Sequence, residues 1–285
     1  MFDWDDLRVF AVLARLGSLT AAARALNVNH ATVGRRVAAL EAALGAPLIV
    51  RLPRSTPLTP QGQAIAAAAQ EMEAAADAVT RRAKTLAATL TGPISISLPP
   101  ALASGFLAER LPTFQSMHPT LSVTLLATST ITSLERGEAD IAIRLVRPDG
   151  PAQIRRRLGE MRLGLYAAPA VARSPASGWR FILSDTDQAD LPHQAWLAHY
   201  AGDRPVAIRS SDIHTQIAAA RAGLGVAAIP HFMANRLDLA QVDAAADVPS
   251  RTIWLVVHEG VRKAPAVQAA AAWLTESFAT SPFRG

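Results

Sequence analysis

Apolar residues near the start of the chain recur at the spacing of a helix that is buried on one side. Leu7, Phe10 and Leu13 are three residues apart, so they line one face of an amphipathic helix. Asp3 is a suitable N-cap, and Gly17 suits the position just beyond the last turn, because glycine accepts the left-handed conformation found there. The pattern predicts a helix between these two residues.

Two more short helices follow in the same segment. Ser18 can cap a helix that ends at Leu26, and Asn29 can cap a third helix that reaches about Leu44. Small and branched side chains of the two helices are expected to pack together: Ala21, Ala22, Ala25 and Leu26 against Val33, Val37 and Leu40. Three short helices joined by tight turns are the skeleton of a helix-turn-helix domain.

The opposite face of the third helix is polar and basic. It carries His30, Thr32, Arg35 and Arg36, groups that can bind base edges and phosphates in a major groove. The alternative for any single arginine is an ordinary solvated helix face. The prediction therefore depends on the order of the elements and not on one residue.

A two-stranded wing is predicted after Gly45. Two short extended pieces surround a Pro-Arg-Ser turn, with Arg51 and Arg54 outermost. Arginines of such a wing lie beside the DNA backbone or in the minor groove, where their effect depends on salt. The alternative is a hairpin that only completes the small core.

A long helix is predicted next, with Thr59 as its N-cap, Pro60 as its first residue and Leu90 near its end. Two lines of residues recur at intervals of seven: Ile65, Met72, Val79 and Leu86, and Ala69, Ala76, Ala83 and Leu90. Such a helix has no core of its own, so the heptads favour pairing with the same helix of a second chain. Packing on the C-terminal half of the protein is the alternative.

From Pro93 onward, strand and helix patterns alternate. Strands are expected at 94–98, 121–127, 140–145, 163–167, 207–209, 226–229 and 253–258, and helices at 102–117, 131–136, 191–200, 213–222 and 265–278. This alternation predicts parallel sheets with helices on their faces. Two small α/β lobes suit the length of this region, with a ligand between them at the strand ends.

Composition narrows the class of protein only slightly. The chain has 28 Lys and Arg against 23 Asp and Glu, a formal charge of +5, which permits an anionic partner without requiring one. Within residues 1–58 the balance is seven arginines against four acids, or +3. The absence of cysteine excludes disulfides and thiolate metal sites. The acidic start and the lack of a long apolar run predict a cytoplasmic protein with no membrane segment.

Three motifs resemble sites of known chemistry but lack the context that such sites need. Gly223, Gly225 and Ala228 match G-x-G-x-x-A, yet the motif follows a helix and enters a strand, the reverse of a dinucleotide site. The histidines show no metal-binding spacing, and no G-x-S-x-G motif accompanies the crowded Ser211, Asp212 and His214. We therefore expect no cofactor, no metal and no enzymatic activity.

Several stretches, taken in order, match one family. They are Trp4–Phe10, Gly17–Leu26, Val28–Gly45, Leu58–Gly62, Leu134–Ile143 and Ala222–Pro230. With these segments the chain resembles the LysR-type transcriptional regulators from end to end. Two departures occur in the third helix: members often have Ser-Gln where this chain has Asn29-His30, and a Ser where it has Gly34. Individual base contacts are therefore not transferable.

The resemblance implies a winged helix-turn-helix at residues 1–59 and a dimerising linker helix at 60–91. An α/β effector domain of two lobes, similar to periplasmic binding proteins, would follow at 92–285. One lobe would comprise residues 92–162 and 257–285, and the other residues 163–256. Members usually form homotetramers from two homodimers, bend double-stranded promoter DNA and respond to a small molecule. A solute-binding or enzymatic α/β protein with an incidental helical N-terminus is the alternative, since fold does not fix function.

The candidate site residues follow from the patterns and the resemblance together. Contacts to DNA are predicted for Ser18, Thr20, Asn29, His30, Thr32, Arg35, Arg36, Arg51 and Arg54. Effector contacts are predicted at strand ends: Pro100, Ala101, Thr128, Ser129, Thr130, Arg144, Ser210, Ser211 and Asp212. Hydroxyl groups and helix N-termini suit an anionic or hydrogen-bonding effector, with Arg144 as a candidate carboxylate partner. A structural ion pair is the alternative role for Arg144.

Overall fold

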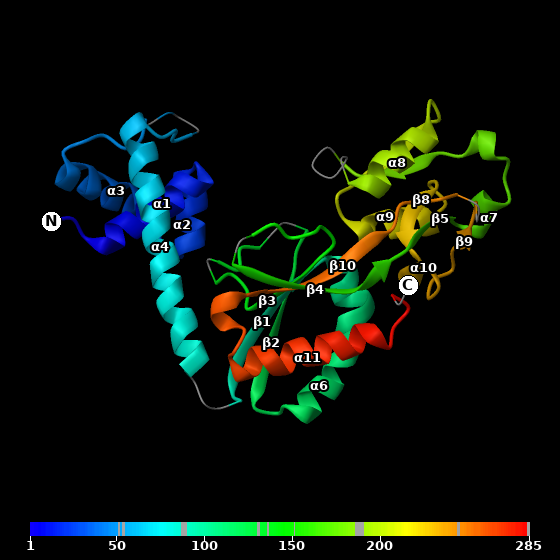
Figure 1. Ribbon diagram of the computed structural model, residues 1–285. Helices are drawn as coiled ribbons and strands as arrows, with labels where there is room; N and C mark the ends of the chain where they lie inside the picture. The colour runs from blue at the N-terminus through cyan, green and yellow to red at the C-terminus, as the bar shows by residue number, and fades with distance from the viewer. Residues whose placement is uncertain are drawn as a thin grey trace. The chain divides into compact units, whose positions relative to one another are not determined.

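The computed structural model describes residues 1–50, 52, 55–86, 90–129, 132–135, 137–150, 152–185, 191–243 and 246–283 (Figure 1). By its internal contacts the chain divides into two compact units, Met1–Arg81 and Arg82–Gly285. No helix among these residues is long and apolar enough to cross a membrane.

The first unit contains the three predicted helices, α1 (Trp4–Leu16), α2 (Leu19–Leu26) and α3 (His30–Leu44). Their ends follow local chemistry. Asp3 Oδ1 accepts a hydrogen bond of 2.8 Å from the backbone N–H of Asp5 at the start of α1, and Asn29 Oδ1 accepts one of 2.7 Å from Thr32 N–H in α3. Gly17 ends α1 with φ 65°, in the left-handed region. The predicted caps are confirmed.

Branched and aromatic side chains of α1 and α3 form the core of this unit. Phe10, Leu13, Val33, Val37 and Leu40 are completely buried. The prediction for α2 was partly wrong: Ala22 and Ala23 are buried, whereas Ala25 is exposed. The reason is that α2 is short and turns a different part of its surface toward its neighbours than the simple alanine pattern indicated.

A hairpin follows α3, as predicted. Ile49 and Leu58 form an antiparallel bridge, and Val50 N–H donates to the carbonyl of Pro57 over 2.8 Å. Arg51 and Arg54 lie outside the described residues.

The long helix α4 spans Pro60–Leu86. Its first turns do have a core to pack on, contrary to the expectation: Ala66 and Ala69 are buried in the first unit, and Ile65 and Met72 pack against the same cluster. Val79, farther along, is 71 % exposed. The helix therefore has an anchored first part and an uncovered apolar residue beyond it.

The second unit begins with a five-stranded sheet in the order β2-β1-β3-β10-β4. The strands are β1 (Gly92–Leu98), β2 (Leu121–Ala127), β3 (Ile141–Arg144), β4 (Gln153–Met161) and β10 (Arg251–His258). Strand β1 is parallel to β2 and β3, whereas β10 is antiparallel to both β3 and β4. The sheet is thus mixed and not parallel. The expected lobe boundary between residues 256 and 257 falls inside β10, which belongs to this first lobe over its whole length.

Helices cover this sheet. A continuous helical segment comprises α5 (Pro100–Leu102), a π-helical turn (Ala103–Leu107), a 3-10 turn (Ala108–Arg110) and α6 (Leu111–Met117). It lies beside α11 (Pro265–Ala279) along one side of the sheet (Figure 1), and the rings of Phe114 and Trp273 join the two helices with centroids 4.7 Å apart. The helix expected at 131–136 does not form over its described residues 132–135, where the chain makes a turn.

The second lobe contains two smaller sheets. One has the order β8-β5-β9, and the other pairs β6 with β7. Their strands are β5 (Leu163–Ala167), β6 (Phe181–Leu183), β7 (Val206–Arg209), β8 (Ala227–Pro230) and β9 (Ala240–Gln241). The helices of this lobe are α7 (Pro169–Ala172), α8 (Pro192–Ala201), α9 (Ile213–Arg221) and α10 (His231–Ala234).

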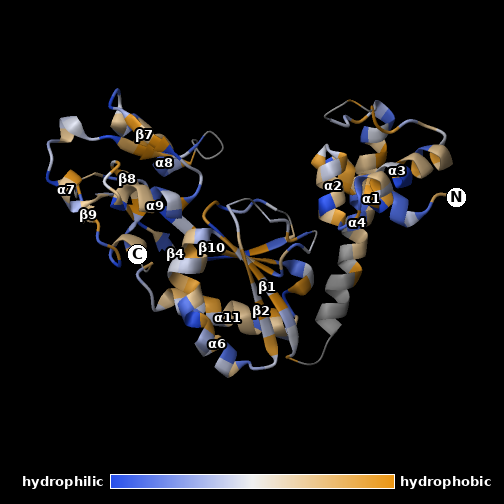
Figure 2. Cartoon of the chain, turned by 180° about the vertical axis from the view of Figure 1, so that it is seen from behind, coloured by the Kyte–Doolittle hydropathy of each residue, from blue (hydrophilic) through white to orange (hydrophobic). Residues whose placement is uncertain are grey.

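Hydrophobic residues are frequent in the strands of both lobes (Figure 2). A cluster of aromatic rings joins the two lobes. The ring centroid of Phe283 lies 4.9 Å from that of Phe106 in the first lobe and 5.0 Å from that of Phe232 in the second. The carbonyl of Phe283 accepts a 2.8 Å hydrogen bond from Glu160 N–H in β4. The end of the chain therefore supports the junction between the lobes.

Replacement by alanine is expected to have opposite effects on stability at two glycines of the first unit. A Cβ at Gly62 in α4 would lie 1.9 Å from the carbonyl oxygen of Leu48, whereas a Cβ at Gly34 in α3 would meet no described neighbour within 4 Å. Gly62→Ala should destabilise the first unit by about 1–3 kcal/mol, because helix and hairpin must separate. Gly34→Ala should stabilise it by up to about 1 kcal/mol through helix propensity.

Hydrogen exchange of the α3 amide groups in the full-length protein measures both effects. Faster exchange in Gly62→Ala and slower exchange in Gly34→Ala are expected. Equal exchange in the two variants would contradict the close contact between α4 and the hairpin.

Candidate functional site

The exposed face of α3 forms a compact polar surface on the first unit. His30 and Arg35 are exposed, while Val33 and Val37 on the opposite face are buried. Asn29 and Thr32 have a structural role as well, because Asn29 Oδ1 accepts bonds from both the N–H and the Oγ1 hydroxyl of Thr32. The helix therefore presents its N-terminal turn and Arg35 outward on a rigid core.

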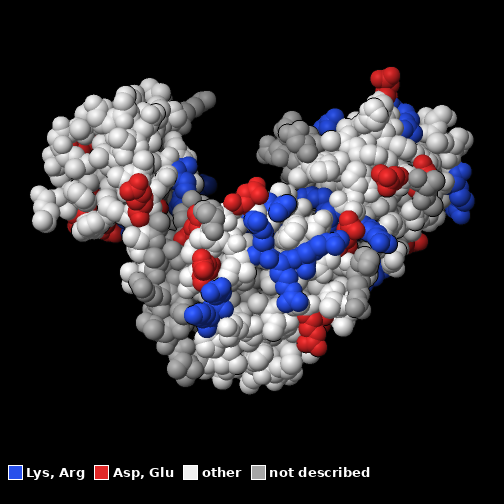
Figure 3. Space-filling model, viewed as in Figure 1, with Lys and Arg blue, Asp and Glu red and all other residues white. Residues whose placement is uncertain are grey.

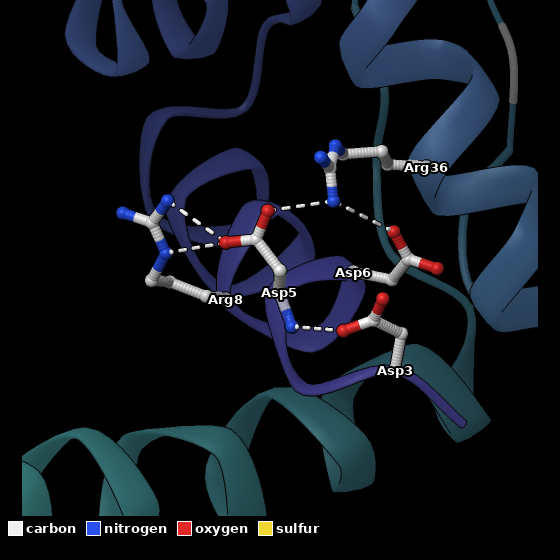
Figure 4. Close-up of polar contacts among 5 residues, drawn as sticks. All are labelled: Asp3, Asp5, Asp6, Arg8 and Arg36. Carbon is white, nitrogen blue, oxygen red and sulfur yellow. Dashed lines mark hydrogen bonds and ion pairs between the residues drawn. The ribbon is translucent and has the colours of Figure 1, made fainter. Parts of the chain in front are cut away.

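Arg36 belongs to an ion-pair network within the first unit (Figure 4). Its Nη1 lies 2.6 Å from Asp5 Oδ2 and 3.3 Å from Asp6 Oδ1, both in the first turn of α1. Asp5 is shared with Arg8, whose Nη2 is 2.9 Å from Asp5 Oδ1. This network ties α3 to α1 and holds the Arg36 guanidinium against carboxylates of its own domain.

The start of α2 supplies the other polar groups predicted for this surface. Ser18 Oγ accepts a long bond of 3.5 Å from Ala21 N–H, so it caps α2. Thr20 is exposed beside it. The backbone carbonyl of Gly17 accepts from both the N–H and the hydroxyl of Thr56, which fastens the hairpin to the turn before α2. The three predicted parts of the surface, α2, α3 and hairpin, thus belong to one folded unit.

The second unit contains a cavity of about 530 Å³ lined by residues of both lobes. Six of the predicted effector residues line it: Pro100, Ala101, Thr128, Ser129, Arg144 and Ser211. Thr130 lies outside the described residues. The volume is within the usual range for small-molecule sites, ~300–1,000 Å³.

Ser210 and Asp212 are not among the residues that line the cavity. Both accept hydrogen bonds from residues of α9. Asp212 Oδ2 accepts from the N–H and the hydroxyl of Thr215 at 2.9 and 2.7 Å. These hydrogen bonds lower the pKa of Asp212, so its charge stabilises the helix N-terminus. The Ser210 carbonyl accepts from Gln216 Nε2 over 2.6 Å. Their contacts with an effector stay predictions.

The cavity is also lined by six buried polar residues that were not predicted from the sequence: Ser97, Ser184, His193, Gln194, Gln216 and Arg251. Gln194 Oε1 accepts a 2.9 Å bond from Ser184 N–H, and Gln216 Nε2 donates to Ser184 Oγ over 3.2 Å. In the sequence, the only sign of these residues was a polar residue in a largely apolar element, such as Arg251 at the start of strand β10. Such a residue indicates a site only when its burial is known.

Arg144 and Arg251 bring two guanidinium groups to the cavity. Arg144 donates through Nη2 to the carbonyl of Thr132, and burial lowers its pKa while Glu135 opposes that shift. Arg251 is only 7 % exposed, and burial lowers its pKa as well. Neither arginine has an ion pair within the described part of the chain, so the structural ion pair considered for Arg144 is not found there.

His193 is an uncharged group in this wall. Burial, with a smaller contribution from the nearby Arg251, lowers its pKa from 6.5 to about 4. The imidazole is therefore neutral at physiological pH. Within the described residues no cluster of side chains with the composition of a metal site occurs.

Two family models match the chain. "Bacterial regulatory helix-turn-helix protein, lysR family" matches residues 4–63, and "LysR substrate binding domain" matches residues 87–279. The first match covers α1–α3, the hairpin and the start of α4, and the second covers both lobes.

Individual relatives agree with these models. The chain is 30% identical over 279 residues to the Mau operon transcriptional activator of Paracoccus denitrificans, covering 97% of each protein. It is 35% identical over 237 residues to the AhcY transcriptional activator HvrB of Rhodobacter capsulatus, covering 77% of each. The full-length virulence activator AphB of Vibrio cholerae has a similar fold, with a TM-score of 0.64 at 19% identity over 96% of this chain and 99% of that one. Full-length CbnR in complex with its target DNA gives a TM-score of 0.58 at 20% identity, over 97% and 100% of the two chains.

Because His193 is buried and neutral, we expect the protein to lose stability in acid. The pKa of His193 is about 4 in the folded protein and 6.5 when exposed, so the unfolded chain takes up the proton first as the pH falls below about 6.5. The free energy of unfolding should drop by about 2 kcal/mol between pH 7 and pH 5 on account of this residue.

His193→Gln should lose less stability over that pH range in thermal unfolding than the unsubstituted protein. His199→Gln, at an exposed position of the same helix, is the control and should follow the unsubstituted protein. A pH profile unaltered by His193→Gln would show that His193 is not the titrating group.

Proposed function

The chain belongs to the LysR family of bacterial transcription regulators, and from that premise we propose which of its residues contact DNA and which contact the effector. It is a DNA-binding regulator with a helix-turn-helix domain and an effector-binding domain, and not an enzyme. Members of this family bind promoter DNA and a small-molecule effector.

The proposed DNA-binding surface is the exposed face of α3 with the start of α2 and the wing. The observation that carries it is the outward position of His30 and Arg35 on a helix whose other face is completely buried. Short polar groups and a guanidinium at the N-terminal part of such a helix suit base edges and phosphates. The remaining proposed contacts are Ser18, Thr20, Asn29, Thr32, Arg51 and Arg54.

Arg36 receives a different role in this proposal. Two carboxylates of α1 already bind its guanidinium, so a direct phosphate contact would compete with them. We assign it to positioning α3 against α1. This role replaces the direct DNA contact expected from the sequence.

The cavity between the lobes is the proposed effector site. Its walls combine residues from the ends of strands β1, β2 and β3 with residues of the second lobe. An effector bound there would contact both lobes and so change their relative arrangement, which is how binding in the second unit can alter the DNA-binding unit.

We further propose a cytoplasmic homodimer formed through α4 that assembles into a tetramer. The exposed Val79 on α4 supports a partner for the part of the helix beyond its anchored first turns. The proposed functional divisions are residues 1–59, 60–91 and 92–285.

Separate substitutions of Arg35 and Arg36 distinguish a residue that contacts DNA from one that positions α3. Arg35→Ala should weaken binding to the promoter fragment upstream of the protein's own gene. The slope of the logarithm of the binding constant against the logarithm of the salt concentration should fall in magnitude by about one. Arg36→Ala should keep the salt dependence and lower the stability of the first unit by less than about 1 kcal/mol, because its ion pair is partly exposed.

Electrophoretic shifts at several salt concentrations measure both effects, with random DNA as the competitor. A salt dependence that falls in Arg36→Ala as it does in Arg35→Ala would assign Arg36 to the DNA surface. Failure of the unsubstituted protein to prefer the promoter fragment would contradict the proposed choice of DNA.

Gly34 allows a second test of the same surface. No described residue occupies the space of a Cβ at this position, so the described part of the fold gives no reason for glycine there. If α3 enters the major groove closely, Gly34→Ala should weaken promoter binding at least fivefold. An unchanged shift with this variant would show that glycine is only tolerated at this position.

A further inference from the structure

Arg251 is an unusual residue for its surroundings. It begins β10, is 7 % exposed and lines the cavity. Buried charges in proteins are normally paired, because an isolated ion loses its hydration. The only acceptor that Arg251 has within the described chain is the carbonyl of Leu145, to which Nε and Nη2 donate over 3.4 and 3.2 Å.

These two bonds leave part of the guanidinium unused. Both are long and both end on one neutral oxygen, which does not compensate the charge. Nη1 makes no hydrogen bond with any described residue. A guanidinium presents its donors as a planar fork that fits a carboxylate with two parallel bonds, so Arg251 has donors available for such a group.

The other charges at the cavity do not neutralise Arg251. The lining includes two more arginines, Arg144 and Arg147, and among its described members a single acid, Asp149. Asp149 is exposed and forms no ion pair with Arg251 within 4.0 Å. His193 adds no charge at neutral pH, since burial lowers its pKa to about 4. The described charged residues that line the cavity are thus mainly positive.

Most of the remaining wall is apolar. It includes Leu98, Ile143, Met161, Leu163 and Pro230. An apolar wall binds hydrocarbon surface and disfavours an ion that would keep its full hydration shell. The combination favours a molecule with one charged end and an apolar body over a free inorganic anion.

We propose that the effector of this regulator is a small organic carboxylate whose carboxylate group binds the Arg251 guanidinium while its apolar body lies against the walls of the cavity. This inference rests on the proposed effector site. It moves the carboxylate partner from Arg144, expected from the sequence, to a residue at the start of β10.

The test uses the full-length protein and a panel of carboxylates from acetate to 4-phenylbutanoate, each paired with its uncharged primary amide, with inorganic phosphate as a further probe. Thermal unfolding and titration calorimetry measure binding. At least one carboxylate should raise the unfolding temperature and bind at least tenfold more tightly than its amide, and phosphate should have no effect. The inference is overturned if no carboxylate binds, if amides bind as well as acids, or if phosphate alone reproduces the effect.

Variants show whether Arg251 is the binding group. Arg251→Met should bind the active carboxylate at least tenfold more weakly, and Arg251→Lys, which keeps the charge but loses the fork, should be intermediate. Arg156→Met, on the exposed strand next to β10, is the matched control and should bind like the unsubstituted protein. Binding within twofold of normal in a folded Arg251→Met or Arg251→Lys protein would overturn the assignment.

An electrophoretic shift of the promoter fragment, measured without carboxylate, tests the proposed DNA binding separately from the inference about the effector. Both the unsubstituted protein and Arg251→Met should shift the fragment, because the substitution is in the other unit. A protein that shifts the fragment but binds no carboxylate overturns only the inference about the effector. A protein that binds a carboxylate but does not shift the fragment overturns only the proposed DNA target.

Discussion

Met161 and Arg251 lie opposite each other at one end of the antiparallel ladder between β4 and β10. The chain leaves the first lobe directly after Met161 and returns to it at Arg251, so the two crossings between the lobes are held side by side by backbone hydrogen bonds. Everything in the second lobe is inserted between these two points. The pairing therefore defines the junction beside which the cavity lies, and it brings the start of β10 into the cavity wall.

The same pairing explains how the edge of the first sheet is protected. Strand β10 occupies an inner position, which leaves β4 at the edge. This edge strand carries the exposed Arg155, Arg156 and Arg157, and basic side chains gather over this region in Figure 3. Charged side chains on an edge strand hinder pairing with other chains. A solvated strand edge is therefore a sufficient explanation for this run of arginines.

Arginine has at least three roles in this protein, and its neighbours decide which role each residue has. Arg36 is held by two carboxylates of α1, and Arg156 is exposed at the edge of a sheet. Arg251 is buried, and its only acceptor among the described residues is a backbone carbonyl. The energetic consequences differ accordingly. A partly exposed ion pair contributes little to stability, whereas a buried cation without a counter-ion is costly until an anion binds.

The sequence by itself determined the family and most of the local elements, although the helix expected at 131–136 does not form over its described residues and β6 was not expected. The caps at Asp3 and Asn29, the end of α1 at Gly17, and the strands at 121–127 and 163–167 all depend on residues a few positions apart, so periodicity and capping chemistry are enough to predict them. The tertiary structure decided what depends on distant residues. Arg36 meets Asp5 across 31 positions, Arg251 meets Leu145 across 106, and β10 inserts between β3 and β4. Ion pairing and burial are set by which segments fold together, and for that reason the roles of Arg36 and Arg251 appear only in the folded chain.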